Sequence, residues 1–231
     1  MALAPPSFGA GPEPSFSYDL SITPEKYGLR IRMSFAPDVS LARVVANLRN
    51  GALLQEFNPD ADPIRTVNAS GDRYDQIMSW KAFGIRTAQL SHCRESEAPG
   101  AWSRRCEVDT GALDAGKYTA WKRDEVRCGR AAGGGIGCDF EIEGRLKNFL
   151  FMKSSVLTLK AKRQALINWG RFWYLTESGS ASTRLSNPLF DRSALKSDLE
   201  SLLSSNLAAA KSRPGEFRLE RHGLFSGSVV R

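Results

Sequence analysis

The sequence contains little of what nucleophilic or metal-based catalysis requires. It has 2 histidines in 231 residues, His92 and His222, and nothing in the sequence places either beside a serine nucleophile and a carboxylate. No Cys-x-x-Cys spacing occurs, and neither histidine is spaced as a partner ligand, which disfavours a zinc site. We therefore expect no metal, no cofactor and no enzymatic activity, with an enzyme as the alternative.

Long apolar runs are also absent. The densest run, residues 149–152, stops at Lys153, well short of the ~20 apolar residues of a membrane-spanning helix. Residues 1–6 carry neither the basic nor the apolar part of a signal peptide. The sequence thus predicts no spanning helix and no signal peptide, and its 42% hydrophobic and 25% charged residues are typical of a globular protein.

Two motifs that resemble catalytic or phosphate sites have simpler interpretations. Asp139, Glu141 and Glu143 share one strand face, but exposed carboxylates in a row are usually solvated, and a catalytic pair needs burial to separate the two pKa values. The glycine-rich residues 133–137 lack the Gly-Lys-Ser/Thr ending and run into a strand, which favours a hairpin tip over a phosphate loop.

Acidic residues are missing from residues 144–176, a stretch with seven cations and several aromatic residues. The whole chain carries a net charge of +7, with 32 basic against 25 acidic residues, which favours anionic partners. Basic and aromatic residues together can bind anionic lipid or single-stranded nucleic acid. A strand with a basic outer face over an aromatic core has the same composition. We expect peripheral contact with an anionic membrane rather than nucleic acid, through Lys153, Lys160, Lys162, Arg163, Trp169, Arg171 and Trp173.

Four cysteines form two local pairs. Cys93 and Cys106 flank one turn-rich segment, and Cys128 and Cys138 flank another, so each pair can face across a hairpin at disulfide distance. We predict two disulfides and hence an exported protein, periplasmic or secreted. Free thiols, and then a cytoplasmic protein, are the alternative.

The N-terminal third has clear strand and helix signals. Residues 27–35 alternate apolar and polar side chains, which predicts a half-buried strand. Asp38 or Ser40 can then cap a helix whose apolar residues recur from Val39 to Leu48, and Asn50-Gly51 ends it. A second short helical turn is expected at residues 52–57.

Turn residues divide the middle of the chain into short segments rich in β-formers, which predicts an antiparallel meander from residue 64 onward. For residues 149–175 we favour strands, although a helical spacing also fits. A long amphipathic helix is predicted at residues 191–211, after a loop at residues 178–188. Residues 1–24 are interpreted as an irregular Pro-rich leader, residues 25–212 as one domain, and residues 213–231 as a tail.

This order of elements resembles the START-like helix-grip superfamily, which includes lipid-transfer domains of the steroidogenic-acute-regulatory type. The resemblance is best at the start, RMSFAPDVSLARVVANLRNGALLQEFNPDADPIRTVNASGDRYDQIMSW, and in the closing helix, RSALKSDLESLLSSNLAAAKS. It implies an α+β fold in which a curved antiparallel sheet, with two short helices after its first strand, wraps around a long C-terminal helix.

The resemblance also implies a function, which is binding or transport of a lipid, sterol or quinone in a cavity between sheet and helix, with residues 178–188 as the gate. An enzyme of the cyclase or hydrolase type on the same fold is the alternative that the resemblance implies. The same apolar side chains could instead fill a solid core, as in a protein-interaction module. The residues expected to line the cavity are Ile31, Met33, Phe35, Trp80, Trp121, Phe140, Ile142, Leu195, Leu199 and Leu202.

Overall fold

The structure is a computed structural model, and it describes most of the chain up to residue 148 and parts of the remaining 83 residues. The described residues are 15–22, 27–51, 53, 62–82, 85–131, 134–148, 165, 168–170, 172–173, 175–177, 216–222 and 226–230.

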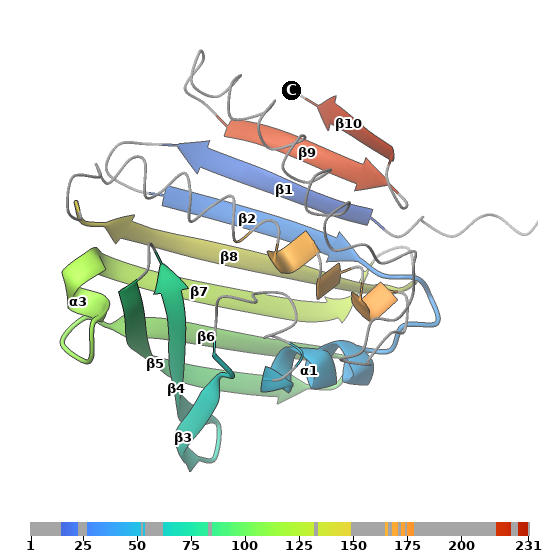
Figure 1. Cartoon of the computed structure of the whole chain (residues 1–231). Coiled ribbons are helices and arrows are strands. Elements are labelled where there is room, and N and C mark those ends of the chain that lie inside the picture. Colours follow the sequence, from blue (N-terminus) through green and yellow to red (C-terminus); the bar gives the residue numbers. More distant parts are fainter. Residues whose placement is uncertain are drawn as a thin grey trace, which may run out of the picture.

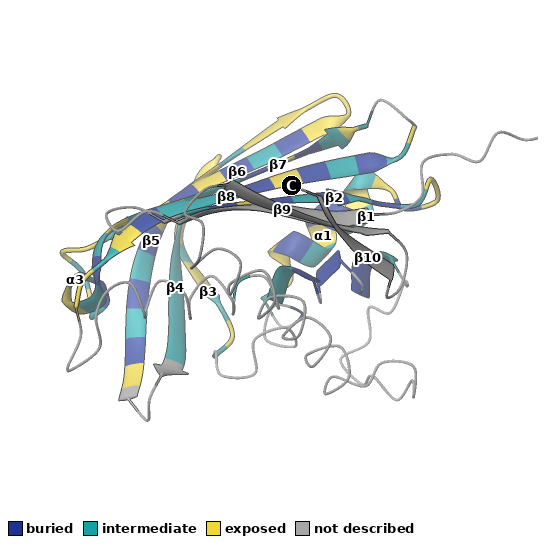
Figure 2. Cartoon of the chain, turned by 90° about the horizontal axis from the view of Figure 1, so that it is seen from above, coloured by how far each residue is buried: buried dark blue, intermediate teal, exposed yellow. Residues whose placement is uncertain are grey.

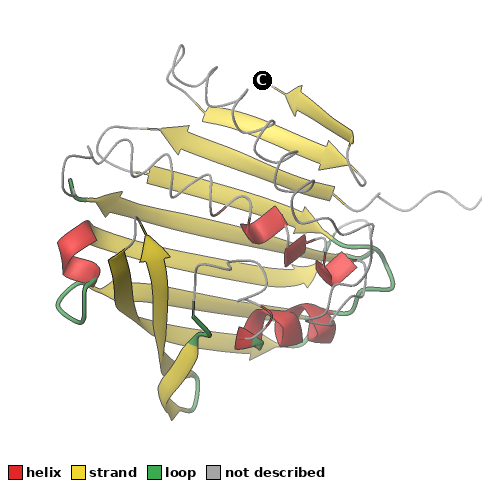
Figure 3. Ribbon diagram, viewed as in Figure 1, coloured by secondary structure: helices red, strands yellow, loops and turns green. Residues whose placement is uncertain are grey.

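These residues form one antiparallel sheet of ten strands (Figure 1) in the order β10-β9-β1-β2-β8-β7-β6-β5-β4-β3. The strands are β1 (Ser15–Ile22), β2 (Tyr27–Ser34), β3 (Arg65–Ser70), β4 (Arg73–Ala82), β5 (Ile85–Ala98), β6 (Ala101–Asp109), β7 (Thr119–Arg130), β8 (Ile136–Leu146), β9 (Glu216–His222) and β10 (Ser226–Val230). The helices labelled in Figure 1, which are drawn in red in Figure 3, are α1 (Leu41–Arg49) and the short α3 (Ala115–Tyr118).

The six strands β3 to β8 are the predicted meander, since each pairs with the next along the chain. The turn between β5 and β6 contains Pro99 and then Gly100, whose φ of 74° is the left-handed conformation that glycine adopts without strain. β2 returns to pair with β8, with Ile31 opposite Phe140. The first predicted strand therefore lies beside the last strand of the meander.

β2 and β8 have one buried and one exposed face, as their alternating sequences predict. Leu29, Ile31 and Phe140 are 2% exposed or less. On the other face Arg32 forms an ion pair with Asp139 at 3.2 Å. Asp139 and Glu141 thus lie on a solvated charged face, as expected, and Glu143 on the same face is more covered where it pairs with Arg123.

The sheet is strongly curved (Figure 2). β6 pairs with β5 only over residues 90–98, so residues 85–89 of β5 pair with β4 alone. There β3, β4 and this part of β5 turn out of the plane of the other strands, toward the side on which α1 lies. The side that carries α1 is the concave face.

α1 forms where the sequence predicts it. The Ser40 side chain accepts a hydrogen bond from the Arg43 amide, which caps the first turn. Val44, Val45 and Leu48 form the buried stripe. Of the second helical turn expected at residues 52–57, the structure describes Leu53, which is helical.

Residues 165, 168–170, 172–173 and 175–177 are helical, so the prediction of strands there is wrong. We name these positions the cover residues, because they pack on the concave face. Trp169, Phe172 and Trp173 follow the spacing of a helix, and their burial outweighs the strand preference of aromatic residues.

The predicted leader and tail each contain regular structure. β1 pairs with β2 and with β9, and β9 pairs with β10, so the expectation of irregular chain is wrong for these segments. The predicted gate at residues 178–188 and the predicted helix at residues 191–211 lie outside the described residues.

Both predicted disulfides are present. Cys93 is bonded to Cys106 and Cys128 to Cys138, each pair directly opposed on neighbouring strands with 4.1 Å between Cα atoms. Within the described part of the chain, no helix is long and apolar enough to cross a membrane.

Candidate ligand-binding site

The concave face has an apolar half built on β2 and β8. Leu29, Ile31 and Met33 of β2 lie beside Phe140 of β8, and all four are 2% exposed or less. Because they belong to the same buried cluster as the apolar stripe of α1, this half of the sheet faces protein rather than water.

The cover residues close this half. Phe140 of the sheet contacts the Trp169 ring at 4.2 Å between centroids, and Phe172 lies 5.7 Å from Trp169 in an edge-to-face arrangement. Trp173 donates from Nε1 to the Ser34 carbonyl at 2.9 Å. Aromatic contacts and a hydrogen bond thus anchor the cover residues to β2 and β8.

Two further polar contacts tie the cover residues to the chain between β2 and α1. The Glu177 carboxylate accepts from the Ala36 amide at 3.1 Å. Asn47 of α1 donates to the Thr176 hydroxyl at 3.2 Å. Burial raises the pKa of Glu177 above its ordinary value, although the Ala36 amide opposes this shift.

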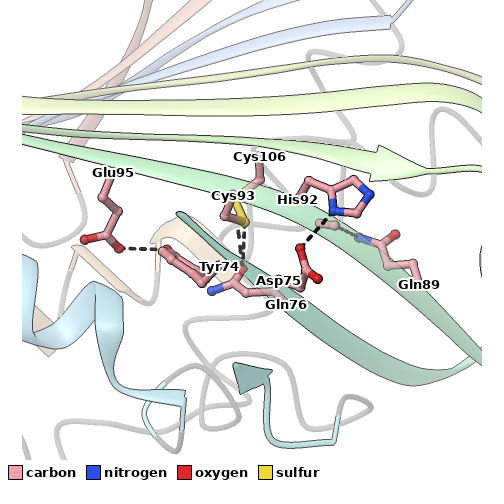
Figure 4. Close-up of a disulfide and its surroundings, with 9 residues drawn as sticks. Tyr74, Asp75, Gln76, Gln89, His92, Cys93, Glu95 and Cys106 are labelled. Atoms are coloured by element: carbon pink, nitrogen blue, oxygen red, sulfur yellow. Dashed lines mark hydrogen bonds and ion pairs between the residues drawn. A yellow bond between two sulfur atoms is a disulfide. The ribbon is translucent and has the colours of Figure 1, made fainter. Parts of the chain in front are cut away.

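The other half of the concave face, on β4, β5 and β6, is polar. Thr87, Gln89 and Ser91 of β5 are each 5% exposed. Gln76 of β4 lies opposite Ser91 and contacts the Cys93–Cys106 disulfide (Figure 4), with its Oε1 3.6 Å from the Cys93 sulfur. The half therefore combines a buried disulfide with amide and hydroxyl groups.

Glu95 is the centre of a hydrogen-bonded cluster in this half. Its carboxylate accepts from the Tyr74 hydroxyl at 2.7 Å, from Trp102 Nε1 at 3.2 Å and from Arg49 Nε at 2.9 Å. Burial raises the pKa of Glu95, but these hydrogen bonds outweigh it and the pKa lies below its ordinary value. Burial raises the pKa of Tyr74 to about 12, so Tyr74 is a neutral donor.

Two groups of the polar half, Thr87 Oγ1 and Arg104 Nε, are buried without a hydrogen-bond partner, and Arg104 is the charged one. It lies opposite Glu95 in the pairing of β5 with β6 and is 7% exposed. Its guanidinium carbon is 5.9 Å from the centre of the Trp102 ring, yet its buried Nε finds no hydrogen-bond partner. Among the described residues Arg104 forms no ion pair, because Arg49, Tyr74 and Trp102 occupy the Glu95 carboxylate. Such a buried donor can bind an oxygen of a ligand.

The structure brings together five of the residues expected to line a cavity and places a sixth in the polar half. Ile31, Met33, Phe35, Phe140 and Ile142 belong to the apolar half, and Trp80 is half-buried opposite Thr87. Whether they line a cavity stays a prediction. Leu195, Leu199 and Leu202 lie outside the described residues.

Trp121 does not belong to the concave face. It is 38% exposed and lies opposite Arg145, on the convex face with the ion-paired Arg123 and Glu143. The expectation that it lines a cavity is wrong. Side chains alternate between the two faces along β7, so Trp121 shares the convex face with Arg123, whereas Lys122 and Asp124 lie on the opposite face. The Trp121 indole is instead part of the outer surface.

The predicted docking segment is also corrected at two positions. Trp169 is half-buried against Phe140, and Trp173 is 5% exposed, so neither presents an aromatic ring to a membrane. Lys153, Lys160, Lys162, Arg163 and Arg171 lie outside the described residues.

His92 lies on the convex face, behind the polar half. Its Nδ1 is 2.8 Å from Asp75, and its Nε2 is 3.5 Å from Asp109. Hydrogen bonding to Asp75 raises the pKa of His92 above its ordinary value. The arrangement ties β4, β5 and β6 together, and no metal-binding group of three or more His, Cys, Asp or Glu side chains occurs among the residues described.

Sequence reasoning missed the polar cluster of Glu95, Tyr74, Arg49 and Arg104. A signal was present, since Trp102, Arg104 and Cys106 alternate along β6. Because side chains alternate along a strand, Cys106 and Arg104 share one face of β6.

Comparison with known proteins agrees with this architecture. The sequence matches no protein-family model and no curated protein. A STAR-related lipid transfer protein of Xanthomonas axonopodis superposes with a TM-score of 0.55 and 13% identity, covering 76% of this chain and 97% of its own. The fold is START-like.

Two human proteins extend this likeness. The lipid transfer and protein localization domain of StarD13 has a TM-score of 0.51 and 6% identity over 70% of this chain and 84% of its own. STARD10 has a TM-score of 0.50 and 7% identity, and the match covers 65% of this chain and 63% of STARD10. At such identities the START-like fold is what the chains share, and the expected helix-grip resemblance is confirmed.

Proposed function

We propose that this START-like protein is a carrier, not an enzyme, and that it binds an amphiphilic small molecule on its concave face. The observation that carries the proposal is the division of one buried face into an apolar half on β2 and β8 and a polar half on β4, β5 and β6. Two of the structural neighbours are named for lipid transfer, which supports the same class of ligand.

In this proposal the apolar half supplies affinity but does not fix the orientation of the ligand. An alkyl chain or ring system placed against Ile142 and Trp169, the half-buried members of this half, leaves water at about 25 cal/mol per Å² of apolar surface. Lipids, sterols and quinones all satisfy this requirement, because an apolar surface selects a ligand by its size and shape more than by its functional groups.

The polar half supplies orientation. A ligand oxygen within reach of Arg104 would satisfy the unpartnered Nε. Tyr74 cannot serve as a base there, because its pKa of about 12 keeps it protonated. The one carboxylate of the cluster, Glu95, already accepts hydrogen bonds from Arg49, Tyr74 and Trp102. The cluster is therefore suited to holding a polar end group, which favours carriage over catalysis.

We place the carrier in an oxidising compartment, periplasmic or extracellular. The support is that all four cysteines are paired in two disulfides on the concave face. An apolar ligand enters and leaves such a compartment through membranes, so we also include peripheral contact with an anionic membrane.

Native mass spectrometry, followed by organic extraction, tests the carrier. We expect a lipid-sized adduct at about one per chain, and uptake of a fluorescent fatty acid by the emptied protein. A folded protein with no adduct and no uptake would falsify the proposal and favour a filled-core interaction module. Chemical conversion of the bound compound would favour the cyclase or hydrolase alternative.

A matched pair of variants places the ligand. Ile142→Trp adds bulk to the concave face and should abolish uptake, whereas Glu141→Trp adds it to the convex face and should not. The two residues are neighbours on β8 and face opposite sides of the sheet. Equal uptake by both variants, each folded by circular dichroism, would contradict a ligand on the concave face.

A further inference from the structure

The large exposed apolar residues of the described chain lie at one end of the sheet. Leu113 is 57% exposed and Trp121 is 38% exposed. Leu113 is in the turn between β6 and α3, and Trp121 follows α3 near the start of β7. Figure 1 shows α3 at this end of the strands, which we call the α3 end.

Leu113 is unfavourable in the isolated protein for two reasons. Its φ of 51° is the left-handed conformation, which is strained for a residue with a branched side chain. Its side chain is also the most exposed large apolar group described. A glycine or asparagine would relieve both costs, so the leucine is not explained by folding.

The turn that carries Leu113 is held firmly. The Asp114 amide donates to the Ala88 carbonyl of β5 at 3.1 Å, and the Lys117 ammonium binds the Asp114 carboxylate at 2.7 Å. Gly116 packs so closely that a Cβ there would lie 2.1 Å from the Thr110 carbonyl oxygen. Leu113 is therefore presented at a fixed position.

Two cations lie at the α3 end, one beside Trp121 and one bound to α3. Arg145 is exposed and lies opposite Trp121, and Lys147 is exposed and donates to the Gly116 carbonyl at 2.7 Å. Neither cation has a carboxylate partner within the described residues, because Glu143 is bound to Arg123 and Asp114 to Lys117. The α3 end thus presents two cations without carboxylate partners together with the exposed leucine and tryptophan.

We propose that the α3 end docks on the surface of an anionic lipid bilayer. Leu113 and Trp121 enter the interfacial region, where an amphipathic indole is favoured, while Arg145 and Lys147 face lipid phosphates. A protein partner is less well matched, because it requires a contiguous apolar patch rather than two separate side chains among cations. The inference rests on the proposed function, because a carrier of apolar ligands has to reach a membrane. The observations behind it and the vesicle assay do not require a bound ligand.

Flotation with vesicles tests the dock. We expect the protein to float with vesicles of phosphatidylcholine and 30% phosphatidylglycerol at low salt, and to lose this binding with phosphatidylcholine alone or in high salt. Replacing Arg145 by Gln should weaken binding about fivefold, the share of one cation near an anionic surface. Arg130→Gln, at the opposite end of β7 and also exposed, should leave binding unchanged.

Leu113→Gly separates docking from folding. Glycine accepts the left-handed backbone, so the melting temperature should stay equal or rise, whereas vesicle affinity should fall about fivefold or more because an apolar side chain no longer enters the interface. If the wild-type protein does not float with anionic vesicles, the proposal is overturned. So do Leu113→Gly and Arg145→Gln variants that bind like wild type. A protein that docks but carries no lipid would overturn the carrier and not the dock.

Discussion

The two halves of the concave face differ in what holds them. On β2 and β8, Phe140 and its neighbours contact the aromatic cover residues, and shape complementarity dominates. On β4, β5 and β6, the Glu95 cluster is held by hydrogen bonds and leaves Arg104 Nε unpartnered. Apolar packing supplies stability, whereas a polar cluster with a free donor costs stability that a ligand can return.

Each half also contains one disulfide. Cys128–Cys138 belongs to the buried hydrophobic cluster, whereas Cys93–Cys106 lies beside the Gln76 side chain. Since the two bonds close loops of similar size, with sequence separations of 10 and 13, they allow the halves to be compared with similar covalent constraints.

The largest effect is expected from Phe172→Ala in the apolar half. Phe172 is fully buried between Phe140 and Trp169, so truncation should lower the free energy of unfolding by about 3–5 kcal/mol. Met78→Ala, at a half-buried position of the polar half, should cost about 1 kcal/mol. Urea unfolding measures both, and equal losses would show that the halves do not differ in packing.

Replacement of each disulfide by two alanines should have the next largest effect. Loop closure predicts a loss of about 3 kcal/mol for either pair. Both pairs are equally buried. The Cys128→Ala, Cys138→Ala variant should lose about 1 kcal/mol more, because its cavity lies in the hydrophobic cluster, whereas the other cavity lies beside the polar Gln76 side chain and can admit water. Urea unfolding with and without a dithiol reductant checks this. A larger loss in the free energy of unfolding for the Cys93→Ala, Cys106→Ala variant would contradict the comparison.

Much of the apolar half was predictable from sequence. The alternation in residues 27–35 and 139–146 correctly placed Ile31 and Phe140 on the buried face, and the cysteine spacing correctly predicted both disulfides. These features depend on local period and on turn residues, which one sequence displays.

The errors arose where tertiary contacts decide the structure. The helical spacing of Trp169, Phe172 and Trp173 competed with the strand preference of the same residues, and packing on Phe140 decides between them. β1 contains an alternation of Phe16, Tyr18 and Leu20, which the surrounding prolines obscured. Trp121 could not be assigned to a face without knowing the pairing of β7.

The smallest effect, and the most specific test of the polar half, is expected from Glu95→Gln. Glutamine retains the shape but cannot carry the charge to which Arg49, Tyr74 and Trp102 donate, so the free energy of unfolding at pH 7 should fall by about 1–2 kcal/mol. Glu97→Gln is the matched control, because Glu97 also pairs with Arg49 but is 62% exposed and should change stability by less than about 0.5 kcal/mol.

The pH dependence of that difference identifies the charge as its cause. Although burial raises the pKa of Glu95, its hydrogen bonds lower it below the ordinary value of 4.5 in the folded state. A lowered folded pKa gives stability that is complete above the unfolded pKa and is lost as the pH falls through the folded pKa. Wild type and Glu95→Gln should therefore differ fully at pH 7 and converge below about pH 4. A difference that persists in acid would mean that glutamine disturbs packing, and the polar half would then be held by shape, as the apolar half is.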